Sequence, residues 1–354
     1  MKSKSIEFSG MNVYVGMDVH KKSWSVTILT DQMEHRTFNQ PPSSETLHRY
    51  LHKHFPGADY YSAYESGFSG YGHHRKLVEL GINNIVINPA DVPTTGKEKA
   101  IKTDKVDSRK IAKGLRSNSL NAIHVFSEEE QDLRSFARTR HIMQRDVRRS
   151  KQRIKMYLLF NTISIPVSLD TDSWTKAFES WLKQVSFPTD RAKRAFEFLL
   201  DNYFFQKQQV RLISKELRAY FRKFHKEPYY LLRSIPGIGP LSAIAIITEL
   251  GDINRFANIN KLSSYVGLMP LMSNSGETER VGRITYRCNT YLRTILVEAS
   301  WQAVRKDPAM MMYYRKHATK GNAKRAIVKV AGKLLNRIRF VLKNKEAYVL
   351  GVLE

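Results

Sequence analysis

The sequence is poor in cysteine and in long apolar runs, and each shortage excludes a class of protein. Cys288 is the only cysteine, so the chain can form no intrachain disulfide and no cysteine-rich zinc site. No run of about eighteen apolar residues occurs, and the first residues lack the apolar stretch of a signal peptide. We therefore expect a protein of a reducing compartment, without a membrane segment and located in the cytoplasm.

Acidic residues are also scarce. The chain has 33 Asp and Glu against 58 Lys and Arg, which gives a formal net charge of +25 and favours nucleic acid as the main partner. The excess charge is spread over several segments with acids between them, unlike the concentrated basic tail of a membrane-surface protein. With 42% hydrophobic residues in 354, the chain has enough apolar side chains for two or three folded domains.

The first third of the chain has the pattern of an α/β domain. Residues 12–20 and 24–30 alternate apolar and polar side chains and predict a β-hairpin, and residues 35–40 continue as a third strand. Helices and strands then alternate up to a helix over 103–115. We expect an α/β layered domain over residues 11–125, with helices on both faces of its sheet.

The rest of the chain predicts helices. Residues 131–156 have apolar residues at helical spacing and nine Arg or Lys against two Asp, and a second long helical block follows. These two blocks predict an antiparallel coiled-coil arm over residues 126–225. A helix, a Pro-Gly-Ile-Gly turn and another helix then open a helical domain over residues 226–354.

Four carboxylates stand at positions that a sheet edge would bring together. Asp18 ends the first strand, Glu65 ends a later strand, and Asp104 and Asp107 lie at i and i+3 on one helix face. Carboxylates this close repel one another unless a divalent cation binds between them, and oxygen ligands beside phosphate suit Mg²⁺ or Mn²⁺. The alternative is that these acids only cap helices and strands.

Two other segments have the composition of functional turns. Ser275 lies in SNSGETERVGR, which reads as an exposed polar loop, and Arg280 and Arg283 follow it closely. By composition alone Ser275 is a turn serine. Gly237 and Gly239 in SIPGIGP have the spacing of a helix-hairpin-helix turn, in which backbone amides can approach a phosphate, although a simple interhelical turn is the alternative.

Basic side chains on the arm and in the last helices are candidates for contacts with a nucleic-acid backbone. Such contacts provide affinity but little sequence information. A solvated helix face is the alternative. The candidates are Arg145, Arg148, Arg149 and Arg153 on the arm, and Arg315, Lys316, Lys324 and Arg325 near the end of the chain.

Six segments, in their order and spacing, resemble the DEDD-type transposases of the insertion-sequence 110 family and the related Piv-type site-specific invertases. They are GMDVHKKSWSV, SAYESG, INP followed by KTDKVDSRKIA, IPGIG, YVGLMPLMSNSG and VGRITYRCNTYLR. The resemblance implies a RuvC-like, ribonuclease-H-type domain with the metal-binding quartet Asp18, Glu65, Asp104 and Asp107. It also implies a coiled-coil arm and a C-terminal transposase domain in which Ser275 is the nucleophile.

The resemblance further implies how such a protein works. Members of the family cut and rejoin donor and target DNA through a phosphoserine link, assemble as tetramers (a dimer of dimers) and take their specificity from a bridge RNA. Because Ser275 is about 170 residues from the quartet, the active site would have to be assembled between domains, plausibly of different subunits. We expect such a protein at the bacterial nucleoid.

Three alternatives remain open from the sequence. A Piv-like invertase would use the same residues to invert a DNA segment. A structure-selective nuclease would use water instead of Ser275, and a nucleic-acid scaffold would use the fold for binding only. His20, beside Asp18, is treated as an ordinary strand-end histidine and is not assigned to the site.

Overall fold

The chain folds into two compact units, Met1–Phe126 and Ser127–Glu354. The computed structural model describes the backbone of residues 8–93, 103–171, 173–275, 278–285, 287–319 and 321–350. The side chains of residues 270–284 lie outside this description. Among the helices of the described residues, none is long and apolar enough to cross a lipid bilayer.

The first unit contains one five-stranded sheet. Its elements are β1 (Asn12–Val19), β2 (Trp24–Thr30), β3 (Glu34–Gln40), α1 (Ser44–His54), β4 (Asp59–Glu65), α2 (Gly72–Glu79), β5 (Asn83–Ile87), the short η1 (Pro89–Asp91) and α4 (Asp104–Arg116). The strand order is β3-β2-β1-β4-β5, antiparallel across the first three strands and parallel from β1 to β4 to β5. The predicted hairpin, third strand and alternating helices are confirmed, and the unit fits the expected ribonuclease-H-type domain.

The period-2 pattern of the strands explains why helices cover both faces of this sheet. On one face, Val15 of β1 is buried in a cluster with Leu47 of α1 and Leu77 of α2. On the other face, Ala63 of β4 is buried in a cluster with Ile111 of α4. Each such leucine or isoleucine contributes about 1.5–3 kcal/mol by burial, so both helix layers stabilise the sheet.

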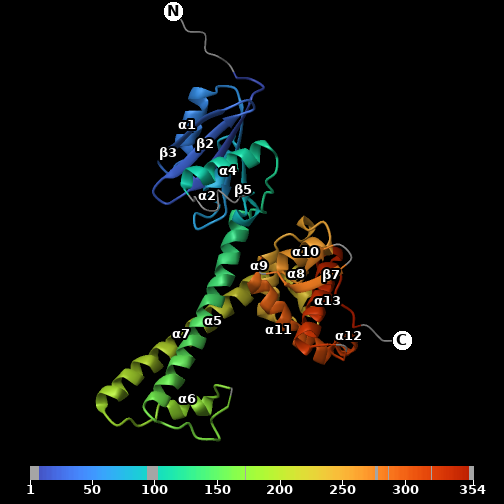
Figure 1. The fold of residues 1–354 in the computed structure, drawn as a ribbon. Helices are drawn as coiled ribbons and strands as arrows, with labels where there is room; N and C mark the ends of the chain where they lie inside the picture. The colour runs from blue at the N-terminus through green and yellow to red at the C-terminus, as the bar shows by residue number, and fades with distance from the viewer. Residues whose placement is uncertain are drawn as a thin grey trace, which may run out of the picture. The chain divides into compact units, whose positions relative to one another are not determined.

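Helix α4 lies over one face of the sheet (Figure 1). It packs against β1 at Gly16. A Cβ atom on Gly16 would collide with the carbonyl oxygen of Ser108 and with the backbone nitrogen of Ala112. The Ser108 hydroxyl lies 2.9 Å from the Thr27 hydroxyl on β2, so the helix is also hydrogen-bonded to the sheet. Glycine at position 16 therefore lets the first turns of α4 lie against the centre of the sheet.

The second unit is helical apart from one hairpin in its described residues. Its elements are α5 (Glu128–Phe160), α6 (Lys176–Leu182), α7 (Asp190–Phe224), α8 (Lys226–Ser234), α9 (Pro240–Leu250), η2 (Ile253–Arg255), α10 (Ile259–Val266), β6 (Pro270–Ser275), β7 (Thr278–Ile284), α11 (Thr290–Lys306), α12 (Pro308–Ala318) and α13 (Ala323–Asn344).

Helices α5 and α7 run antiparallel along each other and form the arm (Figure 1). The Arg140 Nε donates to the Ser214 hydroxyl at 2.9 Å, and the Tyr157 hydroxyl donates to the carbonyl of Ala192 at 3.0 Å. Going along α5 from residue 140 to residue 157, the contacted residue goes back from 214 to 192, as expected for antiparallel helices. The prediction of two long antiparallel helices is confirmed.

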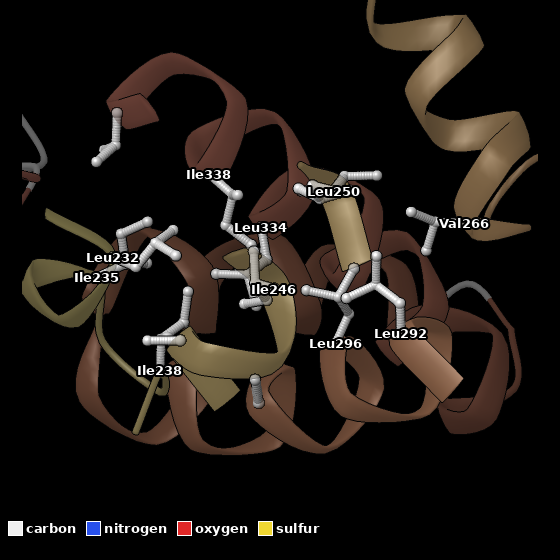
Figure 2. Packing of buried hydrophobic residues seen from close by; sticks show 14 of the residues in the cluster. Leu232, Ile235, Ile238, Ile246, Leu250, Val266, Leu292, Leu296, Leu334 and Ile338 are labelled. Carbon is white, nitrogen blue, oxygen red and sulfur yellow. The ribbon is translucent and has the colours of Figure 1, made fainter. Parts of the chain in front are cut away.

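The base of the arm shares the hydrophobic core of the helices that follow it. Figure 2 shows the centre of this core, where Leu232, Ile246, Leu296 and Leu334 from α8, α9, α11 and α13 lie close together. The arm contributes further buried residues to the same cluster, among them Phe221 of α7. Packing of this kind makes the arm base and the C-terminal helices one compact unit.

The segment that contains Ser275 is not the loop that its composition predicted. Its backbone forms β6 and β7, an antiparallel pair in which Ser275 is opposite Thr278 and Ser273 is opposite Arg280. The turn residues correctly indicated a change of chain direction. They gave no sign of the flanking strands, because backbone hydrogen bonds of a two-stranded ribbon require no apolar alternation.

Gly16→Ala is expected to lower the free energy of unfolding by about 1–3 kcal/mol, because the added methyl group must displace α4 from β1. Chemical denaturation followed by circular dichroism measures this change. Gly332→Ala on α13 is the control: its Cβ would meet nothing within 4 Å, and alanine stabilises a helix by about 1 kcal/mol relative to glycine. Equal stability of the Gly16→Ala and wild-type chains would contradict the close approach.

Candidate active site

Two of the predicted carboxylates lie at the same edge of the sheet. Asp18 is the penultimate residue of β1, and Glu65 is the last residue of the neighbouring parallel strand β4. Met17 is paired with Tyr64, so Asp18 and Glu65 come next on adjacent strands. Parallel strands bring their carboxyl ends to one edge, which explains why residues so distant in sequence become neighbours.

The other two carboxylates occupy the first turn of α4. Thr103 caps the helix by accepting a hydrogen bond from the Val106 nitrogen at 3.4 Å, and Asp104 and Asp107 follow it. Acids in the first turn complement the positive end of the helix dipole. Since α4 packs against β1 at Gly16, this turn is held next to Asp18 at the end of the strand.

Asp18, Asp104 and His20 form the centre of the site. The Nε2 atom of His20 is 3.2 Å from Asp18 Oδ2 and 3.8 Å from Asp104 Oδ1. Each residue offers one ligand atom, and these atoms lie within 4.8 Å of one another. Two carboxylate oxygens and an imidazole nitrogen at this separation are a donor set that a divalent cation can use.

The electrostatics of Asp18 also fit a cation. Burial raises the pKa of Asp18 above its ordinary value, and the charges of Asp104 and Asp107 raise it further, although His20 acts in the opposite direction. The folded chain thus holds the Asp18 carboxylate where its negative charge is disfavoured. A bound divalent cation would reverse this balance, so the residues present fit a divalent cation.

Glu65 and Asp107 are not part of the three-residue ligand group found among the described residues. Glu65 is half-buried at the end of β4. Asp107 forms an ion pair with Lys110, 3.0 Å away and itself almost buried, yet its charge still acts on Asp18. The structure therefore brings Asp18 and Asp104 together directly, with Asp107 close enough for its charge to act on Asp18 and Glu65 on the strand beside Asp18.

His20 is a site residue that sequence reasoning left out. Residues i and i+2 of an extended chain project to the same side, so the spacing of Asp18 and His20 was a usable signal. A histidine after a strand is common on protein surfaces, however, and the contact with Asp104 depends on helix packing that the local sequence does not reveal.

Ser275 lies at the end of β6, next to the turn of the hairpin, in the second unit. Arg280 and Arg283 belong to β7, on the returning strand of the same hairpin. The side chains of all three lie outside the described residues, so their placement here concerns the backbone only. The backbone does establish that one hairpin presents the serine and the two arginines.

Both ends of this hairpin are fixed by α11. Arg293 donates to the carbonyl of Thr285 at 2.7 Å, just after β7, and to the carbonyl of Gly267 at 3.3 Å, just before β6. Gly267 has a φ of 80°, and a Cβ on it would collide with Cys288. Glycine at 267 therefore leaves the space that Cys288 occupies, and Arg293 joins the two strands at their root.

A fully buried carboxylate connects the arm to the base of the β6–β7 hairpin. Glu249, at the end of α9, accepts hydrogen bonds from Arg134 and Arg138 of α5 at 3.0 and 2.6 Å and from Asn289 at 2.7 Å. Burial alone would raise the pKa of Glu249, but the hydrogen bond of Arg138 and the charge of Arg134 hold it below its usual value. Asn289 caps α11, so one charge network links α5, α9 and α11.

The two predicted glycines of the helix-hairpin-helix turn differ in their surroundings. Gly237 has a φ of 93°, and a Cβ on it would collide with the carbonyl oxygen of Ala299. Its lack of a side chain is thus required by packing against α11. Gly239 precedes the first turn of α9, and a Cβ there would meet nothing within 4 Å, so packing does not require glycine at this position.

The predicted basic residues are all exposed. Lys324 and Arg325 lie in the first turn of α13, where positive charge opposes the helix dipole, and thus a role outside local helix stability is favoured. The other six are on α5 and in the last turn of α12. The full set is Arg145, Arg148, Arg149, Arg153, Arg315, Lys316, Lys324 and Arg325.

Comparison with known proteins identifies the class of this chain. Residues 15–161 match the DEDD-type transposase model of the IS110 group, described as "Transposase", and residues 229–315 match the model described as "Transposase IS116/IS110/IS902 family". The chain therefore belongs to the IS110 family of DEDD transposases. Transposases act on DNA, which agrees with the large positive charge.

Several bacterial relatives cover most of the chain. The transposase for insertion sequence element IS1533 of Leptospira borgpetersenii is 27% identical over 303 residues, which are 82% of this chain and 85% of the relative. The transposase for IS1111A of Coxiella burnetii is 25% identical over 287 residues, covering 78% and 76%. The putative transposase y4qE of Sinorhizobium fredii is 27% identical over 241 residues, covering 68% of this chain and 58% of the relative.

Asp18→Asn is expected to stabilise the metal-free chain at neutral pH, because it removes a charge that the folded state disfavours. The pKa of Asp18 is higher in the folded chain than in the unfolded one. The free energy of unfolding of the wild-type chain therefore increases as the pH falls from the folded-state pKa to the unfolded-state pKa. Asp18→Asn should not show this increase. Thermal unfolding in EDTA as a function of pH measures both effects.

Added Mg²⁺ provides the matching test with metal. At about 100 times its Kd, a ligand of the folded state alone stabilises by about 2.7 kcal/mol, and Asp18→Asn should lose most of this gain. Asp201→Asn, an exposed acid of α7, is the control and should behave as wild type. An equal effect of Mg²⁺ on all three proteins would exclude the site at Asp18.

Glu249→Ala is expected to destabilise the chain by about 3–5 kcal/mol, because two arginines lose the carboxylate that neutralises them. The midpoint of urea denaturation measures the loss. Glu197→Gln, which removes an exposed partner of Arg194, should cost about 0–1 kcal/mol. A loss at Glu249 as small as that at Glu197 would show that the network does not hold the unit together.

Proposed function

We propose that this chain is the DNA recombinase of a mobile insertion element, which cuts and rejoins DNA through a covalent phosphoserine at Ser275. The metal site would consist of Asp18, Glu65, Asp104 and Asp107, with Mg²⁺ or Mn²⁺. The observation that supports it most is the meeting of Asp18, Asp104 and His20 at the end of β1.

The roles of the metal-site residues follow from their positions. Asp18 is fixed by the sheet and Asp104 by the start of α4, so their carboxylates can hold a cation with little reorganisation. The His20 Nε2, 3.2 Å from Asp18, would be a further ligand of the cation. When bound, the cation would screen the charge of the scissile phosphate and of the leaving oxygen.

In the proposed step, Ser275 Oγ forms a bond to the scissile phosphorus and gives up its proton. The bond from phosphorus to one sugar oxygen breaks, and that oxygen takes up a proton. Arg280 and Arg283, on the returning strand, would stabilise the charge on the phosphate. Because the serine ester retains the energy of the phosphodiester, a sugar hydroxyl can rejoin the strand without ATP.

The wider assembly is part of the same proposal. We infer a division of labour among a metal-binding domain (11–125), an arm (126–225) and a serine domain (226–354). A homotetramer, a dimer of dimers, would bring donor and target DNA together at the bacterial nucleoid. A bridge RNA would select the sites, since the sequence contains no recognisable base-reading module. Gly239 at the start of α9 and the exposed basic residues would contact phosphates.

Ser275→Ala is expected to lose recombination and the covalent protein–DNA adduct by at least about 10³-fold, because the proposed nucleophile is absent. The adduct is measured on denaturing gels after incubation with Mg²⁺ and DNA that contains the junctions of the element. Ser273→Ala, on the same strand, is the control and should retain both activities. Asp104→Asn should abolish cutting while DNA binding persists.

The same variants separate the alternatives. A nuclease that uses water would continue to cut as Ser275→Ala without forming an adduct. A scaffold would be unaffected by Asp104→Asn. An invertase would lose the adduct as Ser275→Ala, but the wild-type protein would invert the DNA between two sites instead of joining element ends.

A further inference from the structure

A row of basic side chains follows one side of α5 and begins beside α11. The row consists of Arg138, His141, Arg145 and Arg148, at successive spacings of three, four and three residues, which place them on one side of the helix. At the rise of an α-helix they span about 15 Å. We call these four residues the α5 row.

Contacts place the start of the α5 row at the base of the β6–β7 hairpin, which contains Ser275. The ring of His141 is 4.3 Å from the ring of Tyr291, in the first turn of α11. Asn289 and Arg293, which hold that base, lie two residues before and after Tyr291. The row therefore leads along the arm to the base of β6 and β7, all within the second unit.

The positive charges of the row are only partly neutralised. Arg138 is paired with the buried Glu249, which Arg134 already shares. In the described part of the chain, Arg145 and Arg148 form no ion pair with a carboxylate. Arg140 extends from the α7 side of α5, where its Nε donates to the neutral Ser214 hydroxyl.

The surroundings of His141 show how strongly the cations are concentrated. Burial lowers the pKa of His141, and the charges of Arg145, Arg148, Arg140 and Arg138 lower it further. Two acidic groups of this region are already engaged, Glu249 with two arginines and Asp146 with Arg149. Unneutralised cations repel one another, so the free chain is electrostatically strained here.

We propose that the α5 row is a track for the phosphate backbone of the DNA strand that Ser275 attacks. A row about 15 Å long suits a chain of phosphates better than a single small anion, which could meet only one or two of its cations. The track ends at the root of the hairpin, so a bound strand is directed towards β6. This inference rests on the proposed role of Ser275.

Arg145→Gln/Arg148→Gln in a Ser275→Ala background tests the track. Both arginines are exposed, and neither is paired with a carboxylate of the residues that the structure describes. Their removal therefore leaves no described acid without its partner and should leave the melting temperature unchanged or higher. Binding to a labelled DNA duplex is measured by fluorescence anisotropy in EDTA at several salt concentrations. The slope of log K against log salt should become shallower by about 1.8, since each lost phosphate contact removes about 0.9.

The matched control is Arg191→Gln/Lys193→Gln, which removes the same charge from exposed positions in the first turn of α7. Residue 192 is opposite Tyr157, at the far end of the arm from Tyr291. The slope of log K against log salt for this control should change by less than half as much as the slope for the Arg145→Gln/Arg148→Gln variant. Between about 50 and 200 mM salt, the row variant should lose about tenfold less affinity than the Ser275→Ala parent.

Equal slope changes in the two double variants would overturn the track, and so would an unchanged slope in the row variant. A shallower slope for a structured RNA hairpin, with no change for DNA, would also overturn it. The outcome is independent of the nucleophile, because cutting is absent from the assay. If the Ser275→Ala protein still forms the covalent adduct, Ser275 is not the nucleophile. The salt dependence of DNA binding still tests separately whether a DNA backbone follows α5.

Discussion

The burial of the Asp18 carboxylate at one sheet edge, beside the negative charges of Asp104 and Asp107, is the constraint around which the first unit is built. Asp18 is disfavoured as a charged group, yet the fold holds Asp104 and Asp107 beside it. This is possible because Gly16 lets α4 lie against β1, and because hydrogen bonds and buried apolar side chains offset the unfavourable charge. The site is thus a strained arrangement stabilised by the rest of the unit, as expected where a cation completes the structure.

The positive side chains of the second unit are in two different situations. Where α5 meets α9 and α11, the single buried carboxylate of Glu249 neutralises Arg134 and Arg138 and fixes Asn289 at the start of α11. Further along α5, Arg145 and Arg148 receive no such partner in the described part of the chain. The same helix is therefore anchored by its paired cations and available to a polyanion through its unpaired ones, so that stability and binding are assigned to different turns of one element.

Much of the fold could be read from local patterns, because strand and helix periods are properties of short segments. The alternation in residues 12–30 predicted β1 and β2, and the apolar spacing after residue 127 predicted α5 and α7. The segment around Ser275 was predicted to be a loop, but it forms two strands. These strands pair through backbone hydrogen bonds, which leave no pattern in a sequence of polar side chains. Gly237 also has a packing role that its motif did not reveal, because its close approach to Ala299 depends on a helix more than fifty residues away.

For the site, the sequence by itself predicted which carboxylates could bind metal and where each sits in its strand or helix, and it determined how much positive charge the chain carries. Only the tertiary structure decided that His20 joins Asp18 and Asp104, that Lys110 engages Asp107, and that Tyr291 meets the start of the α5 row. The reason is physical. Periodicity and composition act over a few neighbouring residues, whereas the approach of two side chains depends on how separate elements pack, and a single missing Cβ at Gly16 sets that approach.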